Sequence, residues 1–149
     1  MEKIKLQPDF KEFLRLLNLN KVEYLVVGGY AVGHYGYPRA TGDLDIWIAR
    51  TYENAERVAR AVIEFGMPAD QVNAELFRKE NSIVRMGVPP VKIEIITAAS
   101  GVDFKECFSR RQSVKSDDMT VNFISLADLK KNKKNAGRLK DLQDIENLP

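Results

Sequence analysis

The sequence predicts an α/β (α+β) protein in which a mixed β-sheet is flanked by helices. Two observations predict this class: apolar runs of strand length alternate with amphipathic stretches of helical spacing early in the chain, and strands follow one another later. Of the 149 residues, 44% are hydrophobic and 30% are charged, which is typical of a globular chain long enough to bury a core. We expect one domain over 1–149, with a core over 1–124 and a C-terminal helical tail over 125–149.

The first half of the chain alternates helices with strands. Apolar residues at helical spacing predict helices around 10–17 and over 52–65, and Thr51 is a suitable N-cap for the second helix. A continuously apolar run predicts a strand at 23–28 that is buried on both faces. The other elements expected here are a short helix at 30–35 and a strand at 43–49.

The second half is richer in strands. The apolar runs at 82–87 and 91–97 are separated by a Val-Pro-Pro connection and predict two strands joined by a tight turn. A further strand pair is expected at 112–116 and 119–125. The remaining elements are a weaker helix at 70–77, a helical turn at 104–108, and one or two helices over 125–148 with a break near 135–137.

Two aspartates stand one residue apart on the strand at 43–49. Because side chains alternate between the faces of a strand, Asp43 and Asp45 share one face while their apolar neighbours point to the core. Their mutual repulsion would raise one pKa unless a cation lay between them, and oxygen ligands of this kind select Mg²⁺ or Mn²⁺. The alternative is an exposed edge strand that carries acids for solubility, since this short pattern is common by chance.

A third acid lies on the strand at 91–97. Glu94 stands among β-branched residues of a strand that reads as central, where acids are rare unless they are paired or bind a metal. If this strand lies beside the strand at 43–49, Glu94 completes a three-carboxylate metal site. The alternative is a salt bridge to Arg39 or Lys92.

Two glycines, Gly28 and Gly29, follow the strand at 23–28 and precede a short helix. Such a turn exposes backbone N–H groups that can hold a phosphate. A glycine pair by itself more often marks a tight turn, and this one matches neither a P-loop nor a dinucleotide fingerprint.

Together, the segments "VVGG", "GDLDIW" and "KIEII" resemble the motifs of nucleotidyltransferases of the DNA polymerase β-like superfamily. Within that superfamily the chain looks most like the small prokaryotic members, some of which are toxin or antitoxin components, such as the AbiEii and MNT groups. The segment "ISLADLKKNKKNAGRLKDLQDIENL" is similar to the tail of these proteins, so the resemblance covers nearly the whole chain. It implies the polymerase β-like palm fold.

The resemblance also implies a role for each motif. Gly28 and Gly29 would contact the triphosphate of a nucleoside triphosphate (NTP), which is the expected substrate. Asp43, Asp45 and Glu94 would bind the divalent ions, and Glu94 would help to activate the attacking hydroxyl, although many members carry aspartate there. The other expected nucleotide contacts are Arg39, Thr41, Lys130, Arg138 and Lys140.

Larger members of the superfamily close a helical domain over the nucleotide and the acceptor, and this chain has no room for one. We therefore expect the acceptor, a hydroxyl of RNA, a protein or a small molecule, to bind with the help of a second copy, of a toxin–antitoxin partner or on an open face. A non-catalytic binding module of the same fold is the main alternative. An RNA-binding domain that uses the basic tail is a weaker one.

Several other residues have two interpretations. Lys131, Lys133 and Lys134 are expected to form a solvated helix face. The tyrosines Tyr30, Tyr35 and Tyr37 line either the nucleotide pocket or the core, and Trp47 shares the face of the aspartates. We expect a cytoplasmic protein, because no signal peptide or membrane-spanning segment is evident and the single cysteine suits a reducing compartment.

Overall fold

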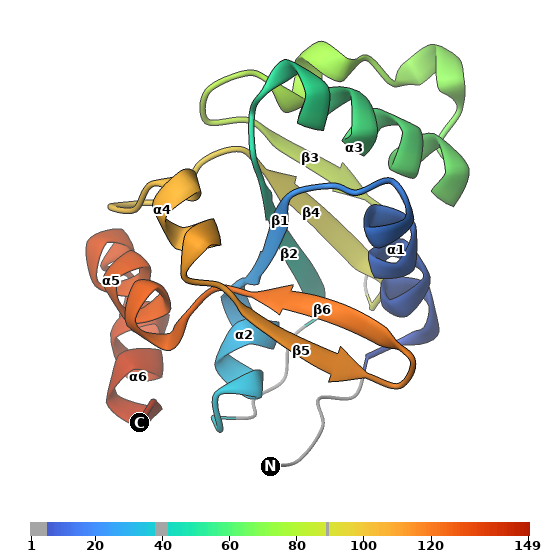
Figure 1. Cartoon of the computed structure of the whole chain (residues 1–149). Helices are drawn as coiled ribbons and strands as arrows, with labels where there is room; N and C mark the ends of the chain where they lie inside the picture. The colour runs from blue at the N-terminus through green and yellow to red at the C-terminus, as the bar shows by residue number, and fades with distance from the viewer. Residues whose placement is uncertain (1–5, 38–41, 89) are drawn as a thin grey trace.

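The computed structural model of the chain describes residues 6–37, 42–88 and 90–149 (Figure 1). Its helices are α1 (Pro8–Leu19), α2 (Gly28–His34), α3 (Tyr52–Phe65), α4 (Phe104–Ser109), α5 (Leu126–Ala136) and α6 (Leu139–Asn147), with 3-10 helices η1 (Ala69–Gln71) and η2 (Ala74–Phe77). Its strands are β1 (Tyr24–Val27), β2 (Asp43–Ile48), β3 (Ile83–Met86), β4 (Lys92–Ile96), β5 (Gln112–Ser116) and β6 (Met119–Phe123).

The strands form one six-stranded sheet in the order β3-β4-β2-β1-β6-β5. The central strand β2 is antiparallel to β1 and parallel to β4. The outer pairs β3–β4 and β5–β6 are antiparallel hairpins, and β6 joins the centre by pairing in parallel with β1. The predicted mixed sheet flanked by helices is therefore confirmed, as is the helical tail.

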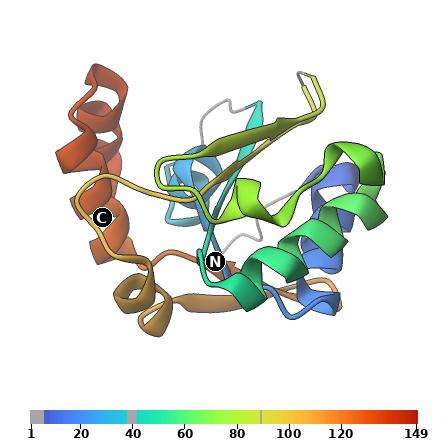
Figure 2. The same ribbon diagram turned by 90° about the horizontal axis from the view of Figure 1, so that it is seen from above.

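The helices lie on opposite sides of the sheet. Helices α1 and α3 pack against each other on one side, and α5 and α6 lie on the other, which Figure 2 shows from above. Among the described residues, no helix is both long and apolar enough to cross a membrane.

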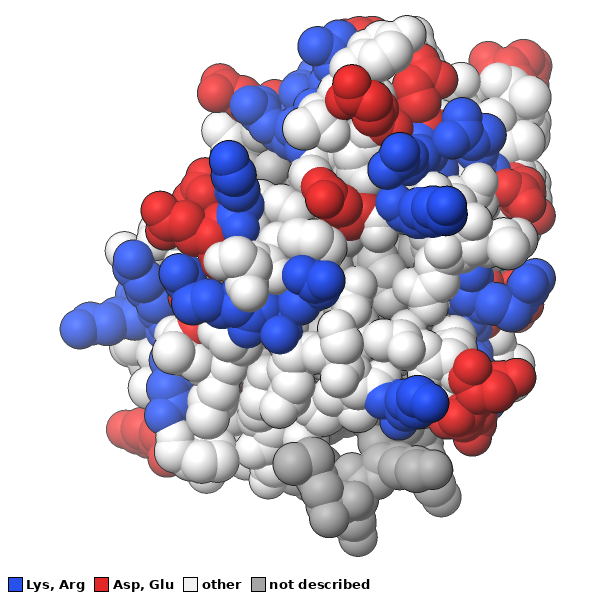
Figure 3. Space-filling view, viewed as in Figure 1, with Lys and Arg blue, Asp and Glu red and all other residues white. Residues whose placement is uncertain are grey.

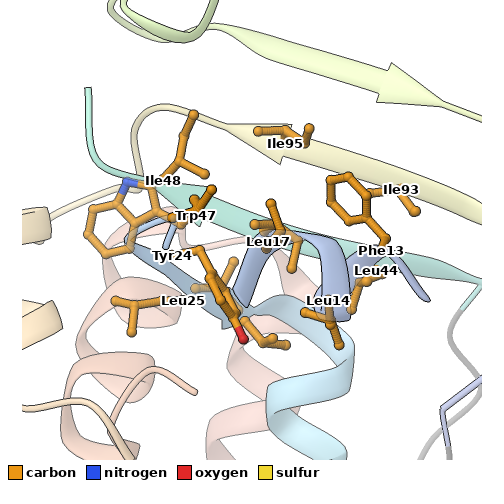
Figure 4. Close-up of a cluster of buried hydrophobic side chains, with 14 of the residues drawn as sticks. Phe13, Leu14, Leu17, Tyr24, Leu25, Leu44, Trp47, Ile48, Ile93 and Ile95 are labelled. Atoms are coloured by element: carbon orange, nitrogen blue, oxygen red, sulfur yellow. The ribbon is translucent and has the colours of Figure 1, made fainter. Parts of the chain in front are cut away.

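The core lies between the sheet and α1. Alternate residues of β2, namely Leu44, Ile46 and Ile48, are fully buried. Figure 4 shows Leu44 and Ile48 in one cluster with apolar side chains of α1 and of β4. This alternation leaves the acids of β2 and β4 on the opposite face, as the sequence predicts.

The face of the acids is covered in part by α4. Trp47 shares this face with Asp43 and Asp45, yet only 2% of it is exposed. The ring of Phe104 at the start of α4 packs edge-on against the indole, with 5.2 Å between ring centroids. The acidic face is therefore open around the aspartates and partly covered by α4 at the end of β2.

Two helical segments differ from those predicted, and one predicted helix break is confirmed. Helix α2 begins at Gly28 itself, so both glycines lie in its first turn. The weaker helix expected at 70–77 is instead the two short helices η1 and η2, because the side chain of Asn73 accepts a hydrogen bond from the Glu75 amide and starts a new turn there. The break predicted near 135–137 is confirmed: Gly137, with φ 69°, ends α5.

Candidate active site

A cavity of about 700 Å³ opens on the acidic face of the sheet. Its floor comes from the ends of β1, β2, β3 and β4, and α5 and α6 form its wall. Six of the residues expected to bind the metal or the nucleotide line it: Gly28, Asp43, Asp45, Glu94, Arg138 and Lys140. A volume of this size is typical of a small-molecule site.

The acids converge because β2 and β4 are neighbours. Asp45 and Glu94 are direct partners in the parallel register, and Asp43 lies opposite Lys92. The adjacency that the sequence left open is thus present. Three carboxylates from two strands face the same cavity.

The charges of these acids act on one another. Burial, and next the negative charges of Glu94 and Asp43, raise the pKa of Asp45 to about 7. Lys140 and Lys133 lower it by a smaller amount. A cation that approaches Asp45 would therefore stabilise its ionised form.

In this structure the nearby cations are basic side chains. The Nζ of Lys92 lies 3.1 Å from Glu94 Oε1 and 3.7 Å from Asp43 Oδ2. On the other side of Glu94, the Nε of Arg85 lies 3.3 Å from Oε1. The salt bridge to Lys92, which was the alternative interpretation of Glu94, is therefore formed, and Arg85 adds a second one.

A three-carboxylate metal site is not preformed. Within residues 6–37, 42–88 and 90–149, no group of three or more His, Cys, Asp or Glu side chains is arranged to hold a metal ion. The physical reason is that the ammonium group of Lys92 lies between the carboxylates of Asp43 and Glu94. The pair Asp43 and Asp45 still offers the oxygen donors that Mg²⁺ and Mn²⁺ prefer, so a divalent ion on this pair fits the chemistry of the site.

The turn at Gly28 is shaped around Asp45. A Cβ atom at Gly28 would lie 2.1 Å from Asp45 Oδ2, and φ at this residue is +68°. Both facts require glycine here. Gly29, by contrast, is buried in the first turn of α2 and does not line the cavity.

Replacing Gly28 with alanine is expected to lower the free energy of unfolding by about 1–3 kcal/mol, because the methyl group would force a strained backbone against the carboxylate. Gly33→Ala is the matched control in the same helix: it has an ordinary φ, and a Cβ atom added there would meet no other atom within 4 Å. It should be neutral or stabilising. Urea unfolding of both variants measures the difference, and equal midpoints would contradict this account of Gly28.

The wall of the cavity is held by buried ion pairs between α5 and α6. Lys133 Nζ lies 3.2 Å from Asp141 Oδ1 and 2.9 Å from Asp144 Oδ2, and all three side chains are at most 5% exposed. The expectation that Lys133 belongs to a solvated face is therefore wrong. Its neighbours Lys131 and Lys134 are exposed, as expected.

Besides Lys133, two basic residues of this wall line the cavity. Arg138 precedes α6, and its Nε donates a hydrogen bond of 2.7 Å to Asp141 Oδ2, which raises the pKa of the arginine. Lys140 follows in the first turn of α6 and is exposed. Both also act electrostatically on Asp45, so the wall supplies positive charge opposite the acids.

The other sequence candidates lie elsewhere. Lys130 donates a hydrogen bond to the carbonyl of Pro149 and is not among the residues that line the cavity. Arg39 and Thr41 lie outside the described residues. The tyrosines belong to the core rather than to the cavity: Tyr30 packs edge-on against Phe10, the hydroxyl of Tyr35 bonds to a backbone carbonyl, and Tyr37 packs on the core.

Of the two basic residues that pair with Glu94, the sequence analysis considered Lys92 only as its salt-bridge partner and missed Arg85. Lys92 could be placed by the strand alternation that puts it on the same face as Glu94, but its contact with Asp43 needs the register between β2 and β4. Arg85 comes from β3, and only the sheet order places it beside Glu94.

Comparisons with known proteins support the fold. No family model matches the sequence, and no curated protein matches it. Among solved structures, the chain is similar to a protein from Thermotoga maritima described as a "putative nucleotidyltransferase". The TM-score is 0.63 at 16% identity, over 95% of this chain and 93% of that chain. The chain has a nucleotidyltransferase-like fold.

This fold accounts for the placement of the motifs. In it, the glycine turn after β1 and the aspartates of β2 meet at one corner of the sheet, where the cavity opens. The face shown in Figure 3 carries Lys and Arg side chains near α4, α5 and α6, with Asp and Glu among them. Charge of mixed sign gives little support to an RNA-binding domain that relies on the basic tail alone.

Proposed function

We propose that the protein is a nucleotidyltransferase that moves a nucleoside monophosphate from an NTP to a hydroxyl acceptor. The observation that carries this proposal is the pair Asp43 and Asp45 facing a cavity beside the Gly28 turn, opposite basic side chains of α6. The likeness of the fold to that of the Thermotoga maritima protein supports it.

Asp43 and Asp45 would hold Mg²⁺ or Mn²⁺, and the bound ion would supply Lewis-acid polarisation of phosphate oxygens. Gly28 lines the same cavity without a side chain, so a triphosphate can approach its backbone. Arg138 and Lys140 face this position from α6 and would offset the charge of the phosphates.

The transfer step forms one bond and breaks one. The acceptor oxygen bonds to the α-phosphorus, the bond from that phosphorus to the bridging oxygen breaks, and pyrophosphate leaves with the electron pair. Glu94 is the base that accepts the proton of the acceptor hydroxyl. Lys92 and Arg85 hold the carboxylate of Glu94 in place beside Asp45.

In this proposal, the acceptor hydroxyl belongs to RNA, a protein or a small molecule. The protein itself belongs to the small AbiEii/MNT-like group of the superfamily. The cytoplasm is the compartment, and a second copy or a toxin–antitoxin partner would complete the acceptor side. The sequence motifs given above support this assignment.

A second candidate is a non-catalytic binding module of the same fold. One observation favours it: Lys92 and Arg85 already form ion pairs with Glu94, Lys92 also pairs with Asp43, and the described residues contain no preformed metal site. This candidate predicts no covalent transfer under any condition.

Incubation with NTPs labelled at the α-phosphate, Mg²⁺, total RNA and cell lysate tests the proposal. The intact protein is expected to label an acceptor, and the double variant Asp43→Asn/Asp45→Asn is expected to lose at least about a thousandfold of that rate, because it removes the expected metal ligands. Lys131→Met, an exposed substitution on α5, is the control. Equal labelling of an acceptor by the intact protein and the double variant would contradict the mechanism. If neither protein labelled an acceptor, the result would favour the binding module.

A further inference from the structure

A second cavity lies beside the first. It measures about 320 Å³ and shares Asn81, Ala98 and Ala99 with the larger cavity, so the two cavities adjoin each other. The rest of its lining comes from the ends of β2 and β4, the start of α4 and the segments beside them: Trp47, Ile48, Arg50, Glu80, Thr97, Val102, Asp103 and Phe104.

One wall of this second cavity is aromatic and carries an unused donor. Trp47 and Phe104 pack edge to face there. The Nε1–H of Trp47 is buried, and within residues 6–37, 42–88 and 90–149 it is the only buried side-chain polar atom that has no hydrogen-bond partner. A buried donor without an acceptor costs about 1–3 kcal/mol, and such a cost is recovered when a ligand supplies the acceptor.

The position of this cavity suits one end of an elongated ligand. Trp47 follows Asp45 by two residues on the same face of β2, which is a separation of about 7 Å. The larger cavity holds the acids and the basic residues of α6, whereas the smaller one has two aromatic side chains in its wall, with the charged residues Arg50, Glu80 and Asp103 around them. A nucleotide suits this pair of cavities, because it has charged phosphates at one end and, beyond the ribose, a flat heteroaromatic ring whose edge carries polar atoms.

We propose that the second cavity binds the base of the nucleoside triphosphate, with Trp47 Nε1–H donating a hydrogen bond to a ring nitrogen or carbonyl on the edge of the base. This inference rests on the proposed function, since it takes the larger cavity as the phosphate site. Bases are held in proteins by contact with aromatic side chains and by hydrogen bonds to their edges, and both features are available here. Asn81, at the junction of the two cavities, is a further polar contact for the nucleoside.

Binding measurements on the full chain test this site. With Mg²⁺ present, titration calorimetry gives the dissociation constants of ATP, GTP, CTP, UTP and inorganic tripolyphosphate. At least one NTP should bind more tightly than tripolyphosphate. Trp47→Phe keeps a ring but removes the donor, so it should weaken that NTP about three- to tenfold and leave tripolyphosphate unchanged. Phe77→Leu, a buried aromatic residue that lines neither cavity, controls for general loosening of the fold.

A second measurement needs no substitution. Trp47 is the only tryptophan, so its fluorescence reports on this cavity alone. A nucleoside without phosphate should change the emission, whereas tripolyphosphate should not, with N-acetyltryptophanamide as the control for absorbance by the base.

The two proposals fail in different ways. If tripolyphosphate and all NTPs bind equally and nucleosides leave the emission of Trp47 unchanged, the base site is overturned while the phosphate site stands. If Trp47→Phe weakens tripolyphosphate as much as the NTPs, the donor has no role at the base. If neither tripolyphosphate nor any NTP binds, the proposed function and the base site are both overturned.

Discussion

Replacing Asp45 with asparagine is expected to stabilise the metal-free protein above pH 7 while removing the proposed transfer activity. Burial and the charges of Glu94 and Asp43 raise the pKa of Asp45 from 3.8 to about 7. Each unit corresponds to about 1.4 kcal/mol, and the partial exposure of Asp45 reduces the effect, so the gain in free energy of unfolding is on the order of 2–4 kcal/mol. An ionised carboxylate at position 45 therefore lowers the free energy of unfolding.

The sign of the pH dependence follows from proton binding. Between about pH 4 and 7 the folded protein holds a proton on Asp45 that the unfolded chain has released, so stability falls as the pH rises through this window. Below pH 4 the group is neutral in both states and the cost disappears. The difference between Asp45→Asn and the intact protein should therefore be near zero at pH 4 and largest above pH 7. The other charged groups that act on Asp45 are Arg138, Lys140 and Lys133, and the two lysines oppose the shift in its pKa.

Urea unfolding at pH 4.5, 6 and 8 in the presence of a chelator measures this dependence. Asp43→Asn is the control, because Asp43 is more exposed, at 37%, and lies 3.7 Å from Lys92 Nζ, so its removal relieves less burial. Added Mg²⁺ should stabilise the intact protein and leave Asp45→Asn nearly unchanged, since a ligand stabilises only the state that binds it. Equal stability of Asp45→Asn and the intact protein at pH 8 would show that burial does not destabilise the ionised form of Asp45.

Much of the fold could be predicted because its signals are local. Alternation along β2 placed Asp43 and Asp45 on one face, and the buried side chains of the other face confirm it. Thr51 caps α3, as predicted, by accepting a hydrogen bond from the Asn54 amide. Such features depend on residues that are close together in the sequence, so they can be predicted from it.

The site needed contacts between distant segments. The pairing of Asp45 with Glu94 follows from the position of β4 next to β2, which no local pattern fixes. The same holds for Arg85, which β3 brings to Glu94. Lys133 shows the limit most clearly, because it sits in a run of lysines with no local sign of burial, and its partners come from the next helix.

Replacing Lys133 with methionine is expected to lower the free energy of unfolding by about 3–5 kcal/mol. The substitution removes a buried cation and leaves the carboxylates of Asp141 and Asp144, which are 1% and 3% exposed, with too little positive charge beside them. Arg138 still pairs with Asp141, so part of the positive charge beside the carboxylates remains. For a domain of marginal stability this is a large fraction of the total.

The urea midpoint of Lys133→Met measures the loss, and an unchanged m-value keeps the comparison valid. Lys134→Met is the matched control: it is the next residue on α5, it is exposed, and its effect should stay within about 0.5 kcal/mol. The triple variant Lys133→Met/Asp141→Asn/Asp144→Asn should recover most of the stability, because it leaves no buried charge in excess. If Lys133→Met cost no more than Lys134→Met, the ion pairs would not be what holds α5 to α6. Since Arg138 and Lys140 reach the cavity from α6, the loss of these pairs should also weaken binding of tripolyphosphate, which links the stability of the tail to the charge opposite the acids.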